Sequence, residues 1–317
     1  MRGAPFAAGR FPADSTPRRS VTVDDMTTPG LPVTPGTPPA GGPPRTGGAD
    51  DGAATATAGA LLRGWRERRG LSQLELALRA DSSARHISFV ETGRSQPSRA
   101  MVLKLAEHLD MPVRERNALL LAAGYAPHYP ETPLDDPAMA ELRQGVEQLV
   151  AAHEPFPAVV VDGAYNVVAA NRGILLVLDG VPEELLRPPL NAMRLTLHPD
   201  GLAKKIRNLP QWRAHLLHQM DRQLSLVRSP ALKELYDEVA AYPLAPEAGD
   251  EEVGEVGGRA PFALPLRVEH DGHLLSFVST ISTFNTPMDV TVSELALETL
   301  LPADPETTKY LRQQLGS

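Results

Sequence analysis

Arg85 is the residue whose chemistry can be specified most closely from the sequence. It lies in the run SSARHISFVETG, near the expected start of a helix, and a guanidinium group there can donate two hydrogen bonds to one guanine edge in the major groove of DNA. The alternative is that Arg85 only forms an ion pair on the protein surface. The pattern favours base contact, with further DNA-facing side chains expected at Ser83, Ala84, Ser88 and Phe89, and phosphate contacts at Gln73 and Arg94.

Two short helices joined by a tight turn would position these side chains. Ser72 and Glu75 have the spacing of a capping box at the start of the first helix. Asp81 occupies the turn, where aspartate tolerates the left-handed conformation, Ser82 or Ser83 can cap the second helix, and Gly93 is suited to end it. An ordinary helical hairpin is the alternative, but the apolar spacing favours a helix-turn-helix packed at a steep angle through Leu76, Ala77, Ile87 and Val90.

Amphipathic segments on both sides complete a predicted all-α domain of five helices over residues 55–126. One helix is expected in ALLRGWRERRG, ending at Gly70, and another opens at Pro97 and Ser98. Pro112 is suited to the first turn of the last helix, which Gly124 closes. The stretch RHISFVETGRSQPSRAMVLKLAEHLDMPVRERNALLLAAGYAP resembles the xenobiotic-response-element-like (XRE) helix-turn-helix regulators, and among them the MmyB type. The resemblance implies a transcription regulator that binds operator DNA.

The charge of the chain is divided between its regions in a way that supports DNA binding. The formal net charge is −8, yet residues 55–125 contain 11 Lys and Arg against 7 Asp and Glu. Residues 126–317 contain 15 against 27, and residues 1–54 contain 5 of each. The positive field is therefore confined to the segment expected to contact phosphates. The acidic remainder must have another role.

The first 54 residues and the overall composition limit the structural class and the compartment expected for the chain. Residues 1–54 are crowded with Pro, Gly, Thr and Ala and cannot bury enough apolar surface to offset backbone entropy, so we expect them to be disordered. Translation from Met26 is an alternative. Cysteine is absent, which excludes disulfides and thiolate chemistry. We find neither an apolar run of about 18 residues that would span a membrane nor the apolar core of a secretion signal, and we expect a cytoplasmic protein.

Residues 135–317 have the pattern of an α+β domain. The phrase HEPFPAVVVDGAYNVVAAN predicts a strand at Ala158–Asp162, a turn and a second extended segment at Tyr165–Ala170. A helix is expected through Leu175–Leu178. Residues 191–242 have helical spacing, LAKKIRN included, and GDEEVGEVGG is a predicted surface loop.

The last part of the chain predicts an antiparallel hairpin. FALPLRVEHDGHLLSFVSTISTF alternates around Asp271–Gly272, which is a hairpin turn signal. A further strand is expected over Pro287–Leu297, followed by a short C-terminal helix. The order of strands and helices predicts a sensor module with an antiparallel sheet.

The same region also resembles known sensor domains. VVVDGAYNVVAANRG is similar to the start of a PAS domain, and LRVEHDGHLLSFVSTISTFNTPMDVTVSELALETLLPADPET and NAMRLTLHPDGL resemble the ligand-binding domain of MmyB-type regulators. The resemblance implies a PAS-like fold that holds a long apolar ligand such as a fatty acid. The bulky apolar side chains that we expect to line this site, each of which is individually better explained as core, are Val160, Val168, Leu197, Trp212, Leu216, Met220, Phe277 and Phe284. Asn171, His198 or Arg194 would orient a carboxylate at its mouth.

Catalysis finds no support in the sequence. His215 and His218 are three residues apart on one predicted helix, but no carboxylate accompanies them as a metal ligand. His198 and Asp200 lie in HPDG, which is turn chemistry before it is an acid–base pair. Nucleophile elbows, phosphate loops and dinucleotide fingerprints are missing. We therefore expect no enzyme, no cofactor and no metal.

Two properties remain open at the level of sequence. Helix-turn-helix domains gain affinity by pairing across a two-fold operator, so we expect a homodimer on DNA. The acidic domain is interpreted as a ligand sensor, and the alternative is a protein–protein interaction module. A sensor should gain thermal stability from an apolar small molecule, whereas an interaction module should expose a contiguous apolar patch.

Overall fold

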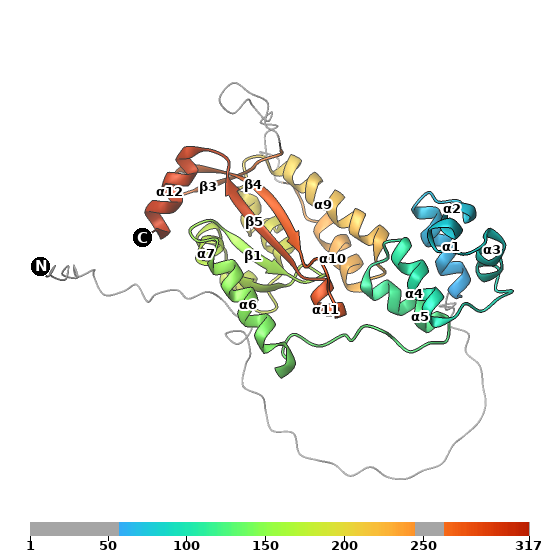
Figure 1. Cartoon of the computed structure of the whole chain (residues 1–317). Helices are drawn as coiled ribbons and strands as arrows, with labels where there is room; N and C mark the ends of the chain where they lie inside the picture. Colours follow the sequence, from blue (N-terminus) through green and yellow to red (C-terminus); the bar gives the residue numbers. More distant parts are fainter. Residues whose placement is uncertain (1–56, 245–262, 317) are drawn as a thin grey trace, which may run out of the picture.

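The computed structural model describes residues 57–244 and 263–316, which form a five-helix domain and a sheet domain (Figure 1). The extension at 1–54 and the loop GDEEVGEVGG, both addressed by the sequence predictions, lie outside the described residues. The all-α domain followed by an α+β domain agrees with the predicted fold class. The helices of the first domain are α1 (Ala58–Arg68), α2 (Gln73–Arg79), α3 (Ala84–Glu91), α4 (Arg99–His108) and α5 (Val113–Ala122).

Local side-chain chemistry sets the ends of α2 and α3. The Ser72 hydroxyl accepts a hydrogen bond from the Glu75 backbone N–H at 3.1 Å, and the Glu75 carboxylate accepts one from the Ser72 N–H at 2.7 Å. This is the predicted capping box, and it satisfies two donors that the first helical turn leaves free. Asp81 turns the chain with φ of +50°, and Gly93 follows α3 with φ of +71°. The turn residues therefore adopt the left-handed backbone that the sequence predicted.

The five helices close around one apolar core. Trp65 from α1, Leu76 from α2 and Ile87 from α3 are all fully buried there. Gly59 allows α1 to approach α3 closely, because a Cβ at this position would lie 2.5 Å from the backbone oxygen of Glu91. The rigid packing of α1 and α2 beneath α3 holds the outer face of α3 in a defined orientation.

The sheet domain has five antiparallel strands in the order β2-β1-β5-β4-β3. Asp271 and Gly272 form the predicted turn of the β3–β4 hairpin, with φ of +47° and +74°. The strands are β1 (Ala158–Val161), β2 (Val167–Ala170), β3 (Leu266–His270), β4 (His273–Thr283) and β5 (Ala296–Pro302). The helices are α6 (Ala140–Ala151), α7 (Arg172–Val177), α8 (Ala192–Leu197), α9 (Leu209–Leu226), α10 (Pro230–Ala240), α11 (Val290–Ser293) and α12 (Pro305–Leu315), with short 3-10 turns η2 (Pro137–Met139), η3 (Glu183–Leu186) and η4 (Leu202–Lys205).

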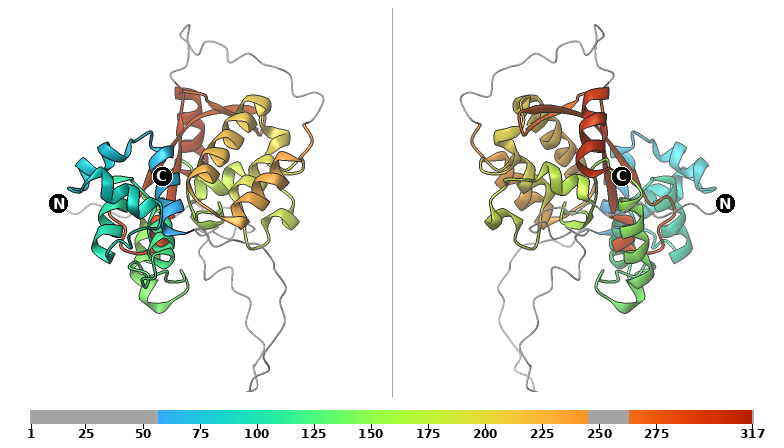
Figure 2. Two further views of the ribbon diagram at one scale, coloured as in Figure 1. Left: turned by 90° about the vertical axis from the view of Figure 1, so that its right-hand side faces the viewer. Right: turned by 90° about the vertical axis from the view of Figure 1, so that its left-hand side faces the viewer.

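The two faces of the sheet pack against different helices (Figure 2). On one face, Val159 and Phe277 belong to a large core that includes Trp212 and Met220 of α9. On the other face, Val160 and its neighbours pack against α6 in a separate, smaller core. Alternation along each strand therefore divides the apolar side chains between two cores.

The predicted strand over Pro287–Leu297 is wrong in its first half, because α11 occupies Val290–Ser293 and β5 begins at Ala296. Asp289 explains the difference. One of its carboxylate oxygens accepts from the Thr291 N–H at 2.8 Å, which caps α11, and the other accepts from the Thr132 hydroxyl at 2.7 Å. The helix predicted in LAKKIRN is likewise only the 3-10 turn η4.

The segment that connects the two domains is tied down at several points. The Asn117 side chain of α5 accepts from the backbone N–H groups of His128 and Tyr129 and donates to the Tyr129 carbonyl at 2.8 Å. Further along, the Pro130 carbonyl accepts from the Val290 N–H at 2.8 Å. The connection is therefore bonded to α5 at one end and to α11 at the other.

Candidate DNA-binding surface and ligand pocket

The second helix of the predicted pair, α3, brings most of the expected DNA-contacting residues together. Arg85 is exposed, and Ser88 and Phe89 are half-buried on the side away from the core. The guanidinium carbons of Arg85 and Arg94 lie 5.2 Å and 5.9 Å from the centroid of the Phe89 ring. Cation–π attraction at these distances holds two cations on one surface. Ala84 begins the helix beside them.

Ser83 has a structural role at the start of α3 as well as its predicted place on the DNA surface. Its hydroxyl accepts from the His86 N–H at 3.1 Å, which caps the helix. A hydroxyl that accepts in this way keeps its own hydrogen for donation to a phosphate oxygen. The cap and the predicted contact of Ser83 with DNA are therefore compatible.

The side chain of Gln73 is hydrogen-bonded to a buried ion pair. The Arg66 guanidinium donates to both carboxylate oxygens of Glu91, at 2.6 Å and 3.0 Å, and the Gln73 side-chain amide donates to the same carboxylate at 2.8 Å. One amide hydrogen of Gln73 is used in this way and the other is left for a phosphate. Glu91 thus positions α2 against α3 from inside the domain.

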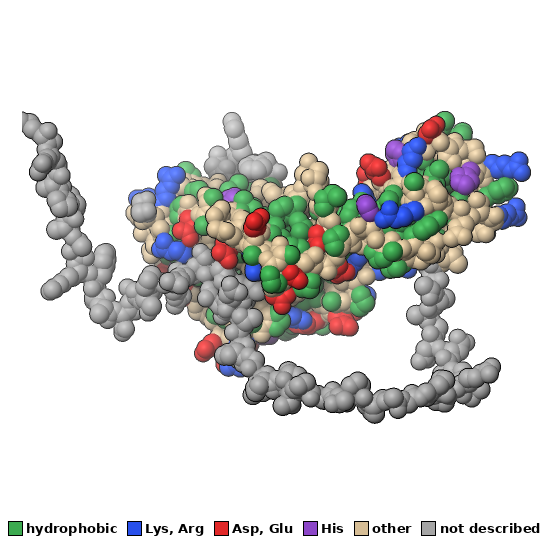
Figure 3. All heavy atoms as spheres, turned by 60° about the horizontal axis from the view of Figure 1, so that its bottom comes forward, with side chains coloured by type: hydrophobic (Ala, Val, Ile, Leu, Met, Phe, Trp, Pro, Cys, Tyr) green, Lys and Arg blue, Asp and Glu red, His purple; other side chains and the backbone are tan. Residues whose placement is uncertain are grey.

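The two domains differ in surface charge along the length of the molecule. Figure 3 shows Lys and Arg side chains at the end of the five-helix domain that is remote from the sheet domain, where α3 lies in Figure 1, whereas Asp and Glu side chains are spread over the sheet domain. DNA can approach this end without meeting the acidic domain.

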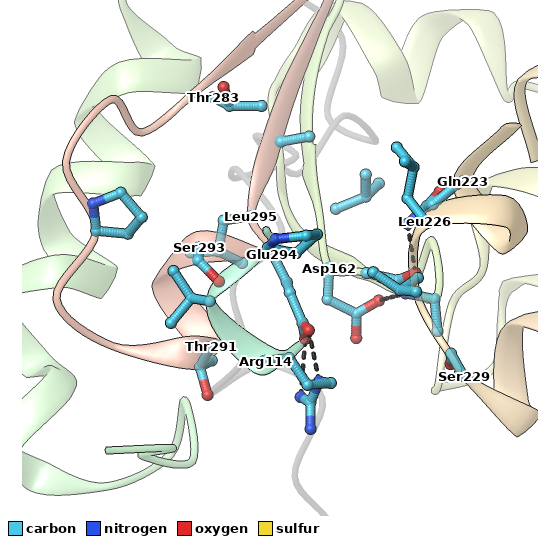
Figure 4. Close-up of a pocket in the computed structure, with 18 of the residues that line it drawn as sticks. Arg114, Asp162, Gln223, Leu226, Ser229, Thr283, Thr291, Ser293, Glu294 and Leu295 are labelled. Atoms are coloured by element: carbon cyan, nitrogen blue, oxygen red, sulfur yellow. Dashed lines mark hydrogen bonds and ion pairs between the residues drawn. The ribbon is translucent and has the colours of Figure 1, made fainter. Parts of the chain in front are cut away.

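A pocket of about 1250 Å3 lies between the domains (Figure 4). The five-helix domain supplies one wall from the start of α5, with Met111 and Val113 among its apolar side chains. The sheet domain supplies the rest, from the β1–β2 turn, the end of α9, the β4–α11 loop and β5, where Leu226 and Leu295 lie. A ligand here would touch both domains at once.

None of the eight apolar residues predicted to line a ligand site lines this pocket. Met220 and Phe277 have 0% exposure, which leaves no surface for a ligand, and Phe284 is exposed on the loop after β4. Bulky apolar side chains serve the packed cores because close packing gains most from them. Leu197, Trp212 and Leu216 join Met220 and Phe277 in the large core, while Val160 and Val168 lie in the smaller core on the opposite face.

The polar interior of the pocket is formed by residues that the sequence patterns did not single out. The Glu298 carboxylate on β5 accepts from the Ser279 hydroxyl at 2.6 Å, and burial raises the pKa of Glu298 above its ordinary value. Nearby, the Gln219 amide donates to the Tyr165 hydroxyl at 3.4 Å, and burial raises the pKa of Tyr165, with Glu298 adding to the shift. Alternation along β5 was the only sequence signal that could have placed Glu298 on this face.

An ion pair between the domains closes the pocket at one side. Arg114 of α5 donates two hydrogen bonds to Glu294 at the end of α11, at 2.6 Å and 2.9 Å (Figure 4). It donates a third to Glu131 at 2.6 Å. These carboxylates raise the pKa of Arg114, and its hydrogen bonds to Glu294 contribute most. A second contact joins the domains where the Glu115 carboxylate accepts from the Arg228 N–H at 3.1 Å.

The residues proposed to orient a ligand carboxylate are engaged elsewhere in the fold. Arg194 is bound to Glu238 at 2.7–3.0 Å, and Asn171 is buried and bonded to backbone groups, including the Ala158 N–H at 3.0 Å. The His198 ring accepts from the Asp200 N–H at 3.1 Å, which is turn geometry. None of these residues lines the pocket.

Metal ligation is not indicated by the arrangement of side chains. His215 and His218 are both exposed on α9, and burial, more than the charge of His218, lowers the pKa of His215. Within residues 57–244 and 263–316, no group of three or more His, Asp or Glu side chains could hold a metal ion. No helix in the same ranges is long and apolar enough to cross a membrane.

Comparison with known proteins assigns both parts of the chain. Residues 57–119 match the family model of a helix-turn-helix domain. Residues 142–313 match the model described as MmyB-like transcription regulator ligand binding domain, which covers more than half of the chain. No curated protein matches the chain. The matched segments coincide with the five helices and with the sheet domain.

Proposed function

Because the chain belongs to the MmyB-like transcription regulators, we propose that α3 reads an operator sequence and that an apolar small molecule in the pocket between the domains controls this binding. The chain is a DNA-binding regulator with a ligand-binding domain. The proposal adds which residues bind the DNA, where the ligand lies and how the two events are linked.

The observation that carries the proposal is that both domains line one pocket. A ligand regulates DNA binding only if it binds the DNA-competent and DNA-incompetent states with different affinity. The five-helix domain contributes Glu107 of α4 and Arg114 of α5 to the pocket wall, and α4 and α5 belong to the same core as α3. A ligand that fits one position of this wall better than another therefore favours one position of the recognition helix.

For the DNA side, we propose that Arg85 contacts a guanine and that its neighbours position it. Arg94 and Gln73 bind phosphates, together with the Ser83 hydroxyl, while Ala84, Ser88 and Phe89 fill the groove beside the bases. One such helix reads only a few base pairs, so the protein acts as a homodimer on half-sites about one DNA turn apart. A regulator that binds operator DNA acts in the cytoplasm.

For the ligand side, the pocket is larger than the range of about 300–1,000 Å3 common for small-molecule sites. Its accessible apolar lining includes Leu226, Ile281 and Met288, which suits a long apolar ligand. A fatty acid is one candidate of this kind. We propose that the ligand contacts these exposed side chains of the pocket and not the buried core.

Native mass spectrometry of the purified full chain, followed by operator binding with and without the ligand found, tests this function. We expect a co-purified apolar molecule whose removal changes operator affinity and whose return raises the melting temperature. An empty protein whose melting temperature and operator affinity do not respond to a panel of apolar metabolites would contradict the proposal. In that case the sheet domain would be a protein-interaction module.

A further inference from the structure

We propose that the pocket selects a ligand whose apolar body ends in a hydrogen-bond donor, an amine or a hydroxyl group, and that Glu298 is the acceptor that selects it. This inference rests on the proposed function, because it assumes that the pocket between the domains is the ligand site. It adds the chemical class of the ligand and the residue that recognises its head group.

The fold directs Glu298 toward the pocket. On β5 it pairs with Val159 of β1 and with Ile281 of β4, so the three side chains share one face of the sheet. Val159 belongs to the large core, and Ile281 and Glu298 line the pocket. Glu298 is therefore the acidic side chain that the sheet itself presents where the core opens into the pocket.

The carboxylate of Glu298 has capacity left for a ligand. One oxygen accepts from the Ser279 hydroxyl at 2.6 Å, and among the described residues no Lys, Arg or His forms an ion pair with this side chain. An ionised carboxylate accepts at two oxygens and about four lone-pair positions. Glu298 is half-buried, and a carboxyl group partly withdrawn from water without a cation loses hydration that a donor or cation on the ligand would replace.

Two of the four arginines that line the pocket, Arg114 and Arg116, are already engaged, whereas Arg222 and Arg228 are exposed, so a carboxylate head group is disfavoured only beside Glu298. Arg114 is bound to Glu294 and Glu131. Arg116 donates to the Met111 carbonyl at 2.8 Å and to the Tyr129 hydroxyl at 3.3 Å. A ligand carboxylate placed beside Glu298 would instead face a like charge.

Two neutral groups complete the recognition site, and neither changes its preference for a ligand that donates a hydrogen bond. Tyr165 and Gln219 line the pocket together with Glu298, and Gln219 donates to the Tyr165 hydroxyl. Both can turn an acceptor toward a ligand N–H or O–H group. A fatty acid can occupy this pocket only with its carboxylate away from Glu298, toward exposed lining residues such as Arg222 and Arg228.

Three probes of equal chain length test the selection: decylamine, 1-decanol and decanoate, each titrated below its aggregation concentration into the full chain by calorimetry. We expect the amine and the alcohol to bind wild type at least about tenfold more tightly than decanoate, because decanoate adds a like charge. Glu298→Gln removes the charge and supplies an amide donor of the same shape. In this variant we expect the amine to lose affinity and decanoate to gain it.

A matched control is Glu107→Gln. Glu107 also lines the pocket, but it is exposed on α4, so the same loss of charge there should leave the order of the three affinities unchanged. The melting temperature of each variant without probe reports whether the fold is retained. Retention is expected for Glu298→Gln, since Glu298 is half-buried and the change removes a carboxyl that lacks a cation.

The possible results separate this inference from the proposed function. Decanoate binding as tightly as decylamine, or an unchanged order in Glu298→Gln, would overturn the donor selection while leaving the pocket as the ligand site. Failure of both donor probes to bind wild type would also overturn it. The proposed function is decided separately, by whether a molecule co-purifies with the chain and changes operator affinity.

Discussion

The five-helix domain holds a buried glutamate and the sheet domain a half-buried one, and the two carboxylates have opposite surroundings. Glu91 accepts from Arg66 at both oxygens and from Gln73. Glu298 accepts from the Ser279 hydroxyl and, in the described part of the chain, has no cation beside it.

The difference separates a structural charge from a charge kept for binding. A buried carboxylate that is fully paired fixes the geometry around it and has no affinity left for another molecule. A half-buried carboxyl without a cation has lost part of its hydration, and a ligand that donates to it can replace what was lost. In this chain the paired glutamate lies beneath the DNA surface, and the unpaired one faces the pocket.

The largest effect that we expect comes from removing the partner of the paired glutamate. Arg66→Met keeps much of the aliphatic stem but leaves Glu91 buried without its cation, which should lower the free energy of unfolding by about 3–5 kcal/mol. Urea unfolding measures this loss. Arg63→Met is the control, because Arg63 pairs with Glu67 on the exposed side of the same helix and its loss should change stability far less. Equal losses in the two variants would remove the distinction between buried and exposed pairs.

Next in size is the loss of DNA affinity in Arg85→Ala. No carboxylate binds Arg85 in the described residues, and its guanidinium is held only over Phe89, so it is free for a guanine. We expect a cost of roughly 1–3 kcal/mol at the operator and a relaxed preference at one base pair. Fluorescence anisotropy with operator and random DNA measures both, and Arg63→Ala serves as the control. Equal weakening on the two DNAs would instead make Arg85 a phosphate contact.

A smaller effect is expected at the ion pair that joins the domains. Arg114→Gln removes the charge that binds Glu294 and Glu131, but these groups are partly exposed, so the free energy of unfolding should change by at most about 1 kcal/mol. Hydrogen exchange should nevertheless increase at α5 and α11, where the contact is lost. Arg172→Gln is the control, because its pair with Glu154 lies within the sheet domain. The same exchange in both variants would show that Arg114 does not hold the domains together.

The smallest expected effect is a pH dependence carried by Glu298. Burial raises the pKa of Glu298 in the folded state, so the folded protein holds this proton more tightly than the unfolded chain does. The stabilising contribution is complete below the unfolded pKa of about 4.3 and is lost as pH rises through the folded pKa. The free energy of unfolding of Glu298→Gln relative to wild type should therefore increase from acidic toward neutral pH. A relative stability that is constant with pH, as expected for Glu107→Gln, would contradict the unpaired state of Glu298.

Local sequence signals predicted the five-helix domain well, because its determinants are local. The Ser72–Glu75 capping box, the turn at Asp81 and the glycine that follows α3 each depend on residues a few positions apart. The β3–β4 hairpin at Asp271–Gly272 was predictable for the same reason. The partition of charge between the two domains was predictable as well, because it depends only on which residues each segment contains.

The pocket could not be predicted in this way, because it depends on contacts between distant segments. Asp289 caps α11 while it also binds Thr132, so a run with strand-like composition became helical. That error moved the expected end of the final strand to Leu297, one residue before Glu298. The size of an apolar residue does not predict that it lines a pocket, because a bulky side chain such as Phe277 packs in a core rather than at a surface left open for a ligand.

The bonded connection between the domains also limits how the protein can respond to a signal. Anchors at Asn117 on α5 and at Val290 on α11 leave few unrestrained residues between them. A short tether keeps its two ends at a high effective concentration, so contacts that break across it re-form readily. The connection therefore keeps the two domains close together instead of leaving them as independent modules. In the proposed dimer on DNA, a change in the angle between the domains would alter the distance between the two recognition helices. Operator binding is sensitive to this distance, because the two half-sites lie a fixed distance apart.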